Sequence, residues 1–255
     1  MPRHIAQWPA FILIAKGVKK LVLPFTMLAS VIGLASAAGA DPILIGPTPY
    51  LQVSDSPFRG TSFSYFHLET FEDGLLNTPG VTASGGFPIG MDMYVDSVDI
   101  EDGVLDGSGS PNGHSFYSGF TEYALTFTFD GAALGFLPTH AGVVWTDIGY
   151  NAPTPYLGPV TFEAFDPLGV SLGLIGPFLL GDGVDTGQTA EDRFFGAFNP
   201  GGISAIRIGT NSADWEVDDL QYGAVHAVPE PSTLLLLGLG GASVAFARRV
   251  RRHRS

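Results

Sequence analysis

Short runs of alternating apolar and polar residues recur through the middle of this 255-residue chain. In the segment 124–129, Leu125, Phe127 and Phe129 fall on one face, and two threonines fall on the other. An alternation of period two indicates β-strands that bury one face. No segment of the middle keeps an apolar period of 3.6 residues, so the pattern does not favour helices there.

Clusters of Gly, Pro, Asn and Asp separate these runs and predict turns between them. The chain therefore favours an all-β fold, a β-sandwich, and among sandwiches a jelly roll. The predicted strands are Ser62–Leu68, Met93–Ile100, Glu122–Phe129, Gly142–Ile148, Val160–Phe165, Val170–Ile175, Phe194–Phe198, Ile203–Ile208 and Trp215–Tyr222.

The N-terminal segment 1–40 has a different pattern. Lysines at 16–20 precede an apolar run at 21–35, and small residues follow, with Ala38 and Ala40 spaced as signal peptidase requires. A similar spacing lies three residues earlier. We expect a signal peptide, and the alternative is an uncleaved anchor, although the apolar run is short for a membrane span.

The C-terminal segment 228–255 has three parts in a fixed order. An apolar Leu- and Gly-rich run at 234–247 leads into an arginine cluster at 248–252, which predicts a single hydrophobic helix held at its cytoplasmic end. The segment opens on a short proline-containing motif: Val228, Pro229, Glu230 and Pro231.

This order resembles the PEP-CTERM sorting signal. The resemblance implies recognition by an exosortase-type protease in a Gram-negative envelope, with transient anchoring in the inner membrane. It also implies association with extracellular polysaccharide and biofilm. We therefore expect an exported protein, found in the cell envelope, on the cell surface or outside the cell.

Between its two ends the chain divides into a Pro-rich leader at 41–60 and an acidic sandwich domain at 61–227. Residues 41–247 carry all 25 acidic residues and three arginines, a net charge of −22. Such a domain should repel nucleic acid and anionic polysaccharide. Divalent cations are natural counter-ions for so many carboxylates, although acidity also simply keeps an exported protein soluble. The absence of cysteine excludes disulfides and thiolate metal sites.

Two acidic pairs stand near the ends of the domain, in Phe71-Glu72-Asp73 and in Val217-Asp218-Asp219-Leu220. They resemble carbohydrate-binding jelly rolls of the galactose-binding type, in which acidic residues of the two terminal strands hold a structural Ca²⁺. The resemblance implies a calcium site formed by Glu72, Asp73, Asp218 and Asp219. The alternative is that all four are solvated carboxylates at strand ends. A further acidic stretch, residues 92–106, does not match an EF-hand loop.

Enzyme signatures are missing from the sequence, which has no G-x-S-x-G elbow, H-E-x-x-H motif or P-loop. We predict a non-enzymatic surface or matrix protein that binds glycan or calcium, with Tyr150 and Tyr156 as candidate sugar contacts. A secreted hydrolase that acts on polysaccharide is the alternative, since 25 acids could supply the pair of carboxylates that such an enzyme needs.

Overall fold

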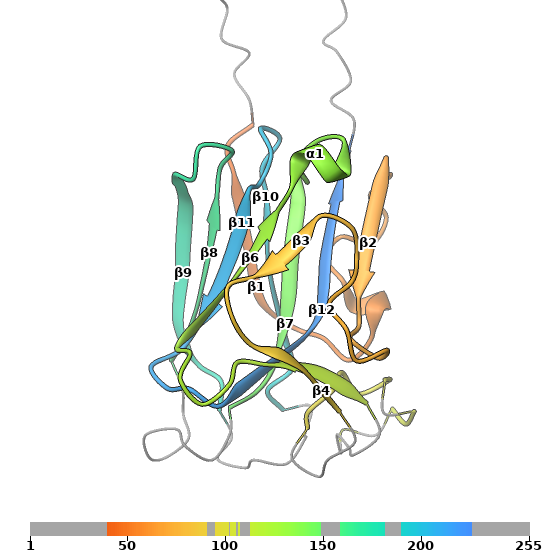
Figure 1. Cartoon of the computed structure of the whole chain (residues 1–255), viewed down its shortest axis with the longest axis vertical. Coiled ribbons are helices and arrows are strands. Elements are labelled where there is room, and N and C mark those ends of the chain that lie inside the picture. The colour runs from red at the N-terminus through yellow and green to blue at the C-terminus, as the bar shows by residue number, and fades with distance from the viewer. Residues whose placement is uncertain are drawn as a thin grey trace, which may run out of the picture. The chain divides into compact units, whose positions relative to one another are not determined.

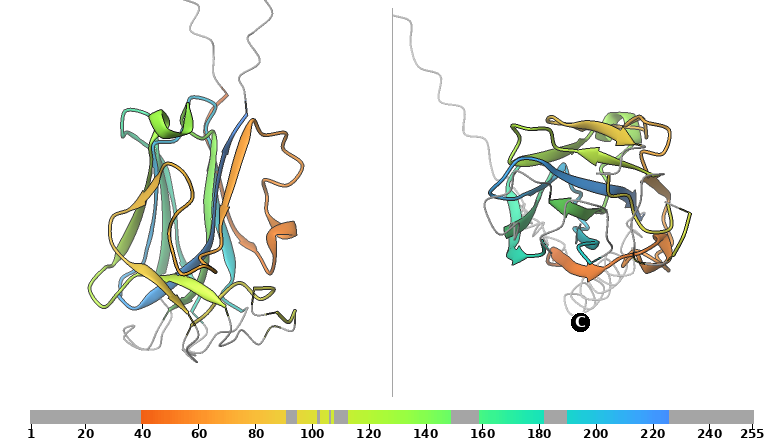
Figure 2. Two further views of the ribbon diagram at one scale, coloured as in Figure 1. Left: turned by 45° about the vertical axis from the view of Figure 1, so that its right-hand side comes forward. Right: turned by 90° about the horizontal axis from the view of Figure 1, so that it is seen from below.

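The computed structural model describes residues 40–90, 95–101, 103–105, 107, 113–148, 159–181 and 190–225. In this part of the chain two antiparallel sheets pack face to face as a β-sandwich (Figure 1). Figure 2 shows the same sandwich from two further sides. The predicted all-β class and sandwich architecture are confirmed.

The larger sheet has the order β1 (Ile43–Pro49), β10 (Arg193–Phe198), β7 (His140–Ile148), β12 (Trp215–Ala224), β5 (His114–Tyr117) and β4 (Phe87–Gly90), while β2 (Tyr65–Glu69) also pairs with β12. The smaller sheet has the order β3 (Val81–Ala83), β6 (Ala124–Phe129), β11 (Ala205–Gly209), β8 (Pro159–Phe165) and β9 (Ser171–Leu179). Two short helices complete the described elements: η1 (Val53–Asp55) and α1 (Gly131–Leu134).

The core lies between the two sheets and is rich in aromatic rings. On β6, Leu125, Phe127 and Phe129 are buried while Thr128 is exposed, as the alternation predicts. Within the larger sheet, Trp145 of β7 stacks on Trp215 of the neighbouring strand β12 with ring centroids 5.2 Å apart, and both rings lie in the core. Stacked aromatic pairs of this kind add to the stabilisation that burial of their area provides.

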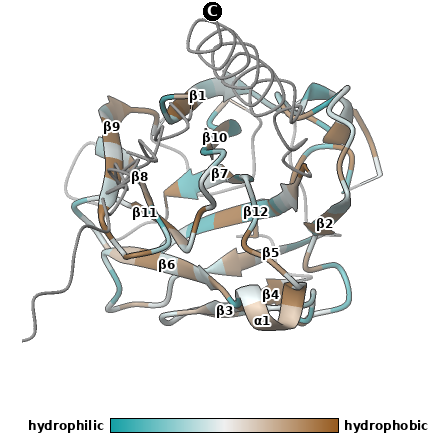
Figure 3. Cartoon of the chain, turned by 90° about the horizontal axis from the view of Figure 1, so that it is seen from above, coloured by the Kyte–Doolittle hydropathy of each residue, from teal (hydrophilic) through white to brown (hydrophobic). Residues whose placement is uncertain are grey.

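Strand β12 is the most enclosed element, because all ten of its residues are buried. It pairs with β7 along one edge. Along its other edge it pairs first with β5, at Glu216 and Val217, and then with β2, from Leu220 onward. Polar and apolar residues are mixed along it (Figure 3), so its central position carries acidic side chains into the interior.

The structure differs from the sequence expectations in several segments. Strands β3, β4 and β5 were not predicted. The segment 41–60, expected to be a leader over the surface, contains β1, which pairs with β10 at the edge of the larger sheet. Proline is tolerated in an edge strand because one side of that strand makes no ladder bonds. Residues 95–100, expected to continue a strand, are irregular, and their polar side chains turn inward toward β12.

Adjacent positions of β6 test how the sandwich is held together. Phe127→Ala should lower the free energy of unfolding by about 3–5 kcal/mol, because it removes a fully buried ring and leaves a cavity. Thr128→Ala, on the exposed face of the same strand, should change it by less than about 0.5 kcal/mol. Urea denaturation of the purified protein measures both, and equal effects would contradict the assignment of faces.

Candidate functional site

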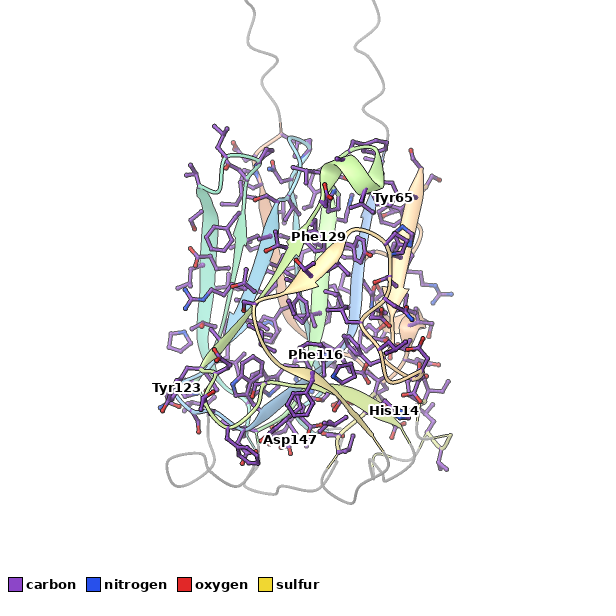
Figure 4. All side chains as sticks on the ribbon, viewed as in Figure 1. Tyr65, His114, Phe116, Tyr123, Phe129 and Asp147 are labelled. Atoms are coloured by element: carbon purple, nitrogen blue, oxygen red, sulfur yellow. The ribbon has the colours of Figure 1, made fainter. Side chains whose placement is uncertain are left out.

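Acidic side chains gather in the interior near the end of the sandwich where Asp147 lies (Figure 4). None of them is more than 5% exposed. We call them the carboxylate cluster, and its members are Asp96, Asp99, Asp147, Glu191, Asp192, Glu216, Asp218 and Asp219. Buried acids are costly unless they are paired, protonated or bound to a cation, so each member requires a physical account.

A β-bulge in β12 gives the cluster two of its members. The register between β12 and β7 shifts between Asp218 and Gln221, and Asp219 adopts a positive φ of 42°. Aspartate tolerates this left-handed conformation better than most residues do. A bulge changes the direction in which side chains point, and both aspartates are fully buried instead of alternating between the two faces.

Asp218 has a complete set of partners. Its Oδ2 accepts hydrogen bonds from the Ser97 hydroxyl at 3.1 Å and from the Val98 amide at 2.9 Å. Its Oδ1 accepts a bond from the Asp219 amide at 2.7 Å. The irregular segment 95–99 therefore turns inward because its donors satisfy an acid of the central strand.

Glu216 is held in a similar way from two sides. Its Oε2 accepts hydrogen bonds from the Ser115 hydroxyl at 2.6 Å and from the Asp96 amide at 2.9 Å. Burial nevertheless raises the pKa of Glu216 to about 8, against the lowering effect of these two bonds. At neutral pH this carboxyl therefore holds a proton unless a positive charge lies near it.

Asp219 belongs to a buried chain of polar groups. The Tyr50 hydroxyl donates to its Oδ2 at 2.5 Å and accepts from the Gln221 amide nitrogen at 2.6 Å. The Ser56 hydroxyl donates to Gln221 Oε1 at 2.6 Å. This chain ties the segment 50–56 to β12 and closes one side of the cluster.

Other oxygens of the cluster have no hydrogen-bond partner within the part of the chain that the structure describes. Both carboxylate oxygens of the fully buried Asp192 lack one there, as do Asp96 Oδ1, Asp99 Oδ2 and Asp219 Oδ1. The neighbouring Arg193 donates to the backbone carbonyl of Asp192 at 2.7 Å. Unpartnered buried carboxylate oxygens from four separate positions indicate a cluster whose charge is not balanced by the protein groups described.

Burial and mutual repulsion act together on these acids. Burial is the larger cause and raises the pKa of Asp96, Asp192 and Asp218 well above the usual range. Neighbouring carboxylates raise each of them further. The pKa of Asp219 is raised to about 7, first by burial and then by the charges of two nearby glutamates.

The four residues expected to form a calcium site occupy three different environments. The aspartates at 218–219 lie in the cluster. Glu72 accepts hydrogen bonds from the amide of His114 at 2.7 Å and, at 3.4 Å, contacts its ring Nδ1. Asp73 lies in a surface turn, where it accepts a bond from the side chain of Asn77 at 2.6 Å. Glu72 nevertheless lies near enough for its charge to raise the pKa of Asp219, whereas Asp73 makes its contacts within its own turn, so the structure does not bring all four together.

Sequence reasoning missed several acids that the structure places in the cluster, above all Asp99, Asp147 and Asp192. One signal was available, since Asp147 follows Trp145-Thr146 within a strand whose neighbours are apolar, and an acid there must be buried. The acidic stretch 92–106 also alternates with valines at 95 and 98. An acid in an apolar strand is thus a better indicator of a site than an acid at a strand end.

The cluster contains only oxygen ligands of the kind that hard cations bind. Among the described residues, no group of three or more acidic or histidine side chains is already arranged to hold a metal ion. Tyr150, Tyr156, Ala38 and the tail motif at 228–231 lie outside the described residues.

Comparison with known proteins identifies the tail. Residues 227–252 match the model of the PEP-CTERM protein-sorting motif. The chain carries a PEP-CTERM sorting signal. The resemblance seen in the tail is thereby confirmed, and it indicates an exported protein that exosortase-type machinery sorts to the cell envelope or surface.

The sandwich itself has no counterpart in the other comparisons. No curated protein and no solved structure matches the chain. In the part of the chain that the structure describes, no helix has the length and apolar character needed to cross a membrane.

The raised pKa values predict how stability depends on pH when divalent cations are removed. Glu216 and Asp219 bind protons more tightly in the folded state, with pKa values of about 8 and about 7, than in the unfolded chain. These two carboxyls therefore hold more protons in the folded state, and their contribution to stability falls as pH rises. Burial lowers the pKa of His67 and His140, which acts in the opposite direction below about pH 6.5. In EDTA, the melting temperature should therefore decrease from about pH 6.5 to pH 8. A melting temperature that rises over this range would contradict the burial of these acids in ionisable form.

Proposed function

We propose that this exported protein is a non-enzymatic module of the cell surface or extracellular matrix, sorted by its tail, whose sandwich is stabilised by Ca²⁺ in the carboxylate cluster. The observation that carries the calcium proposal is the set of unpartnered, buried carboxylate oxygens on Asp96, Asp99, Asp192 and Asp219. A divalent cation would supply the positive partner that these carboxylate oxygens lack.

Calcium fits this ligand set better than other common metals. The cluster offers carboxylates and no thiol or imidazole, which disfavours zinc and copper. Ca²⁺ accepts six to eight oxygens in irregular geometry, whereas Mg²⁺ demands a near-ideal octahedron. Because the side chains are not already arranged around one point, binding requires carboxylates to rotate, and a flexible coordination shell suits that adjustment.

The burial of the cluster supports a structural role and not hydrolysis. A glycosidase needs two carboxylates that a sugar can reach, one as acid and one as base or nucleophile. The acids gathered here are at most 5% exposed, and several of them hold backbone amides or hydroxyls in place. Such groups are suited to binding an ion that links segments distant in sequence.

Calcium should stabilise the protein measurably. Extracellular modules bind Ca²⁺ with dissociation constants of about 10⁻⁴–10⁻³ M. If the constant is about 0.1 mM, 10 mM Ca²⁺ adds about 2.7 kcal/mol and should raise the melting temperature by roughly 5–10 °C. Differential scanning fluorimetry in EDTA and in CaCl₂ measures this, and no shift at 10 mM would contradict the proposal.

The variant Asp192→Asn, measured by the same fluorimetry in EDTA and in CaCl₂, distinguishes Ca²⁺ binding in the cluster from a general effect of salt. It removes one unpartnered charge, so at pH 7.5 in EDTA it should be at least as stable as the unmodified protein, while its gain from Ca²⁺ should fall. The matched control is Asp73→Asn, in a surface turn, which should keep the full gain. Equal gains for both variants would place the ion elsewhere.

Sorting can be tested in cells. Replacing Pro229 and Glu230 with alanine should prevent recognition by the exosortase, so that the protein keeps its tail and stays with the inner membrane fraction. Deleting the sorting protease should give the same result with the unmodified chain. Fractionation and the mass of the mature protein report the outcome, and an unchanged location and mass in both cases would contradict sorting through this motif.

A further inference from the structure

An exposed aromatic surface lies next to a depression on the smaller sheet. The turn between β5 and β6 carries Phe120 and Tyr123, which are 75% and 58% exposed. Phe87 of β4 is 53% exposed and contacts Tyr117, whose ring also contacts Phe120. We call Phe87, Phe120 and Tyr123 the aromatic ledge. Large apolar rings grouped on a surface commonly mark a contact with a partner or ligand.

The ledge is held rigidly by the turn that leads into β12. The indole nitrogen of Trp215 donates to the Glu122 carbonyl at 3.0 Å, and the Asp214 amide donates to the Gly119 carbonyl at 3.0 Å. The Thr210 amide donates to the Tyr123 carbonyl at 3.0 Å. A surface whose backbone is fixed before a ligand arrives loses little entropy on binding.

The depression beside the ledge has a volume of about 420 Å³, within the range of small-molecule sites. Tyr123 lies at its edge, at the outer surface of the protein (Figure 4). The strands β8 and β11 contribute polar groups to the lining through Thr161, Glu163 and Arg207. Tyr123 is the ledge residue that lines the depression, so one aromatic ring stands beside a polar floor on this face.

Two opposite charges on that floor stand opposite each other without pairing. Arg207 and Glu163 are register partners on β11 and β8. Within the described residues, neither side chain forms an ion pair with the other or a hydrogen bond. The other two arginines of the segment 41–247, Arg59 and Arg193, each donate to a backbone carbonyl. Arg207 and Glu163 thus offer a donor fork and an acceptor to a ligand.

We propose that the aromatic ledge and this depression form a binding site for a neutral glycan. A pyranose ring has an apolar face of C–H groups that can stack on Tyr123, and its hydroxyls can accept from Arg207 and donate to Glu163. Anionic polysaccharide is disfavoured because the surrounding segment 41–247 carries a net charge of −22. The proposal rests on surface display of the protein, and it is independent of calcium in the carboxylate cluster.

The test uses the full-length protein and defined hexasaccharides. Isothermal titration with neutral gluco-, galacto- and manno-hexasaccharides should show binding to at least one, and an alginate hexasaccharide should bind much more weakly. Tyr123→Ala and Arg207→Ala should each weaken binding of that neutral sugar about tenfold or more. Tyr123→Phe, which keeps the ring, should retain most of it.

Matched controls separate the site from the fold and from the proposed calcium function. Phe136→Ala and Arg59→Ala, at other surfaces, should leave the affinity unchanged. All variants should keep the melting temperature and its shift with Ca²⁺, so loss of glycan binding alone is distinguishable from failure of the calcium proposal. Absence of binding to every neutral sugar, preference for alginate, or unchanged affinity in both Tyr123→Ala and Arg207→Ala would overturn the inference.

Discussion

The burial of β12 along its entire length is the constraint on which the rest of this sandwich depends. The strand supplies Trp215, Val217 and Leu220 to the core. It pairs with β7 along one edge and with β5 along the other. Its sequence also carries three acids, which cannot leave the interior without removing those apolar side chains from the core. The surrounding loops must therefore supply hydrogen-bond donors or a bound cation for the buried carboxylates.

Two buried acids, Glu69 and Asp192, differ in how their oxygens are partnered. Glu69 of β2 accepts hydrogen bonds from three backbone amides, those of Phe71, Asn77 and Thr78, and so needs no cation. Asp192 is equally enclosed, and among the described residues no donor reaches either of its oxygens. A chain able to satisfy Glu69 fully could satisfy Asp192 in the same manner. The proposed calcium site accounts for this contrast, because the oxygens of Asp192 would bind Ca²⁺ once the protein is outside the cell.

The sequence was sufficient for the architecture because the strands that form the core alternate. Leu125, Phe127 and Phe129 required a strand with one buried face, and the structure has one there. Strand β1 could not be predicted, because its prolines resemble a linker and its partners in β10 lie about 150 residues away in sequence. The cluster was predicted only at Asp218 and Asp219. Its other members come from loops and strand ends whose meeting is set by tertiary packing, which no local pattern encodes.

The strand order also gives the sandwich two different ends. Ile43 pairs with Phe198, Phe198 with His140, and His140 with Gly223. The beginning of β1 and the end of β12 therefore lie at the same end of the sandwich. The sorting tail follows β12 directly, so any tether through the tail holds the protein there. Trp215, at the opposite terminus of β12, lies about 30 Å away and contacts both the core and the turn that carries Tyr123. The aromatic ledge thus lies away from the end of the sandwich that the tail follows, on an exposed surface that stays accessible while the chain is held by its tail.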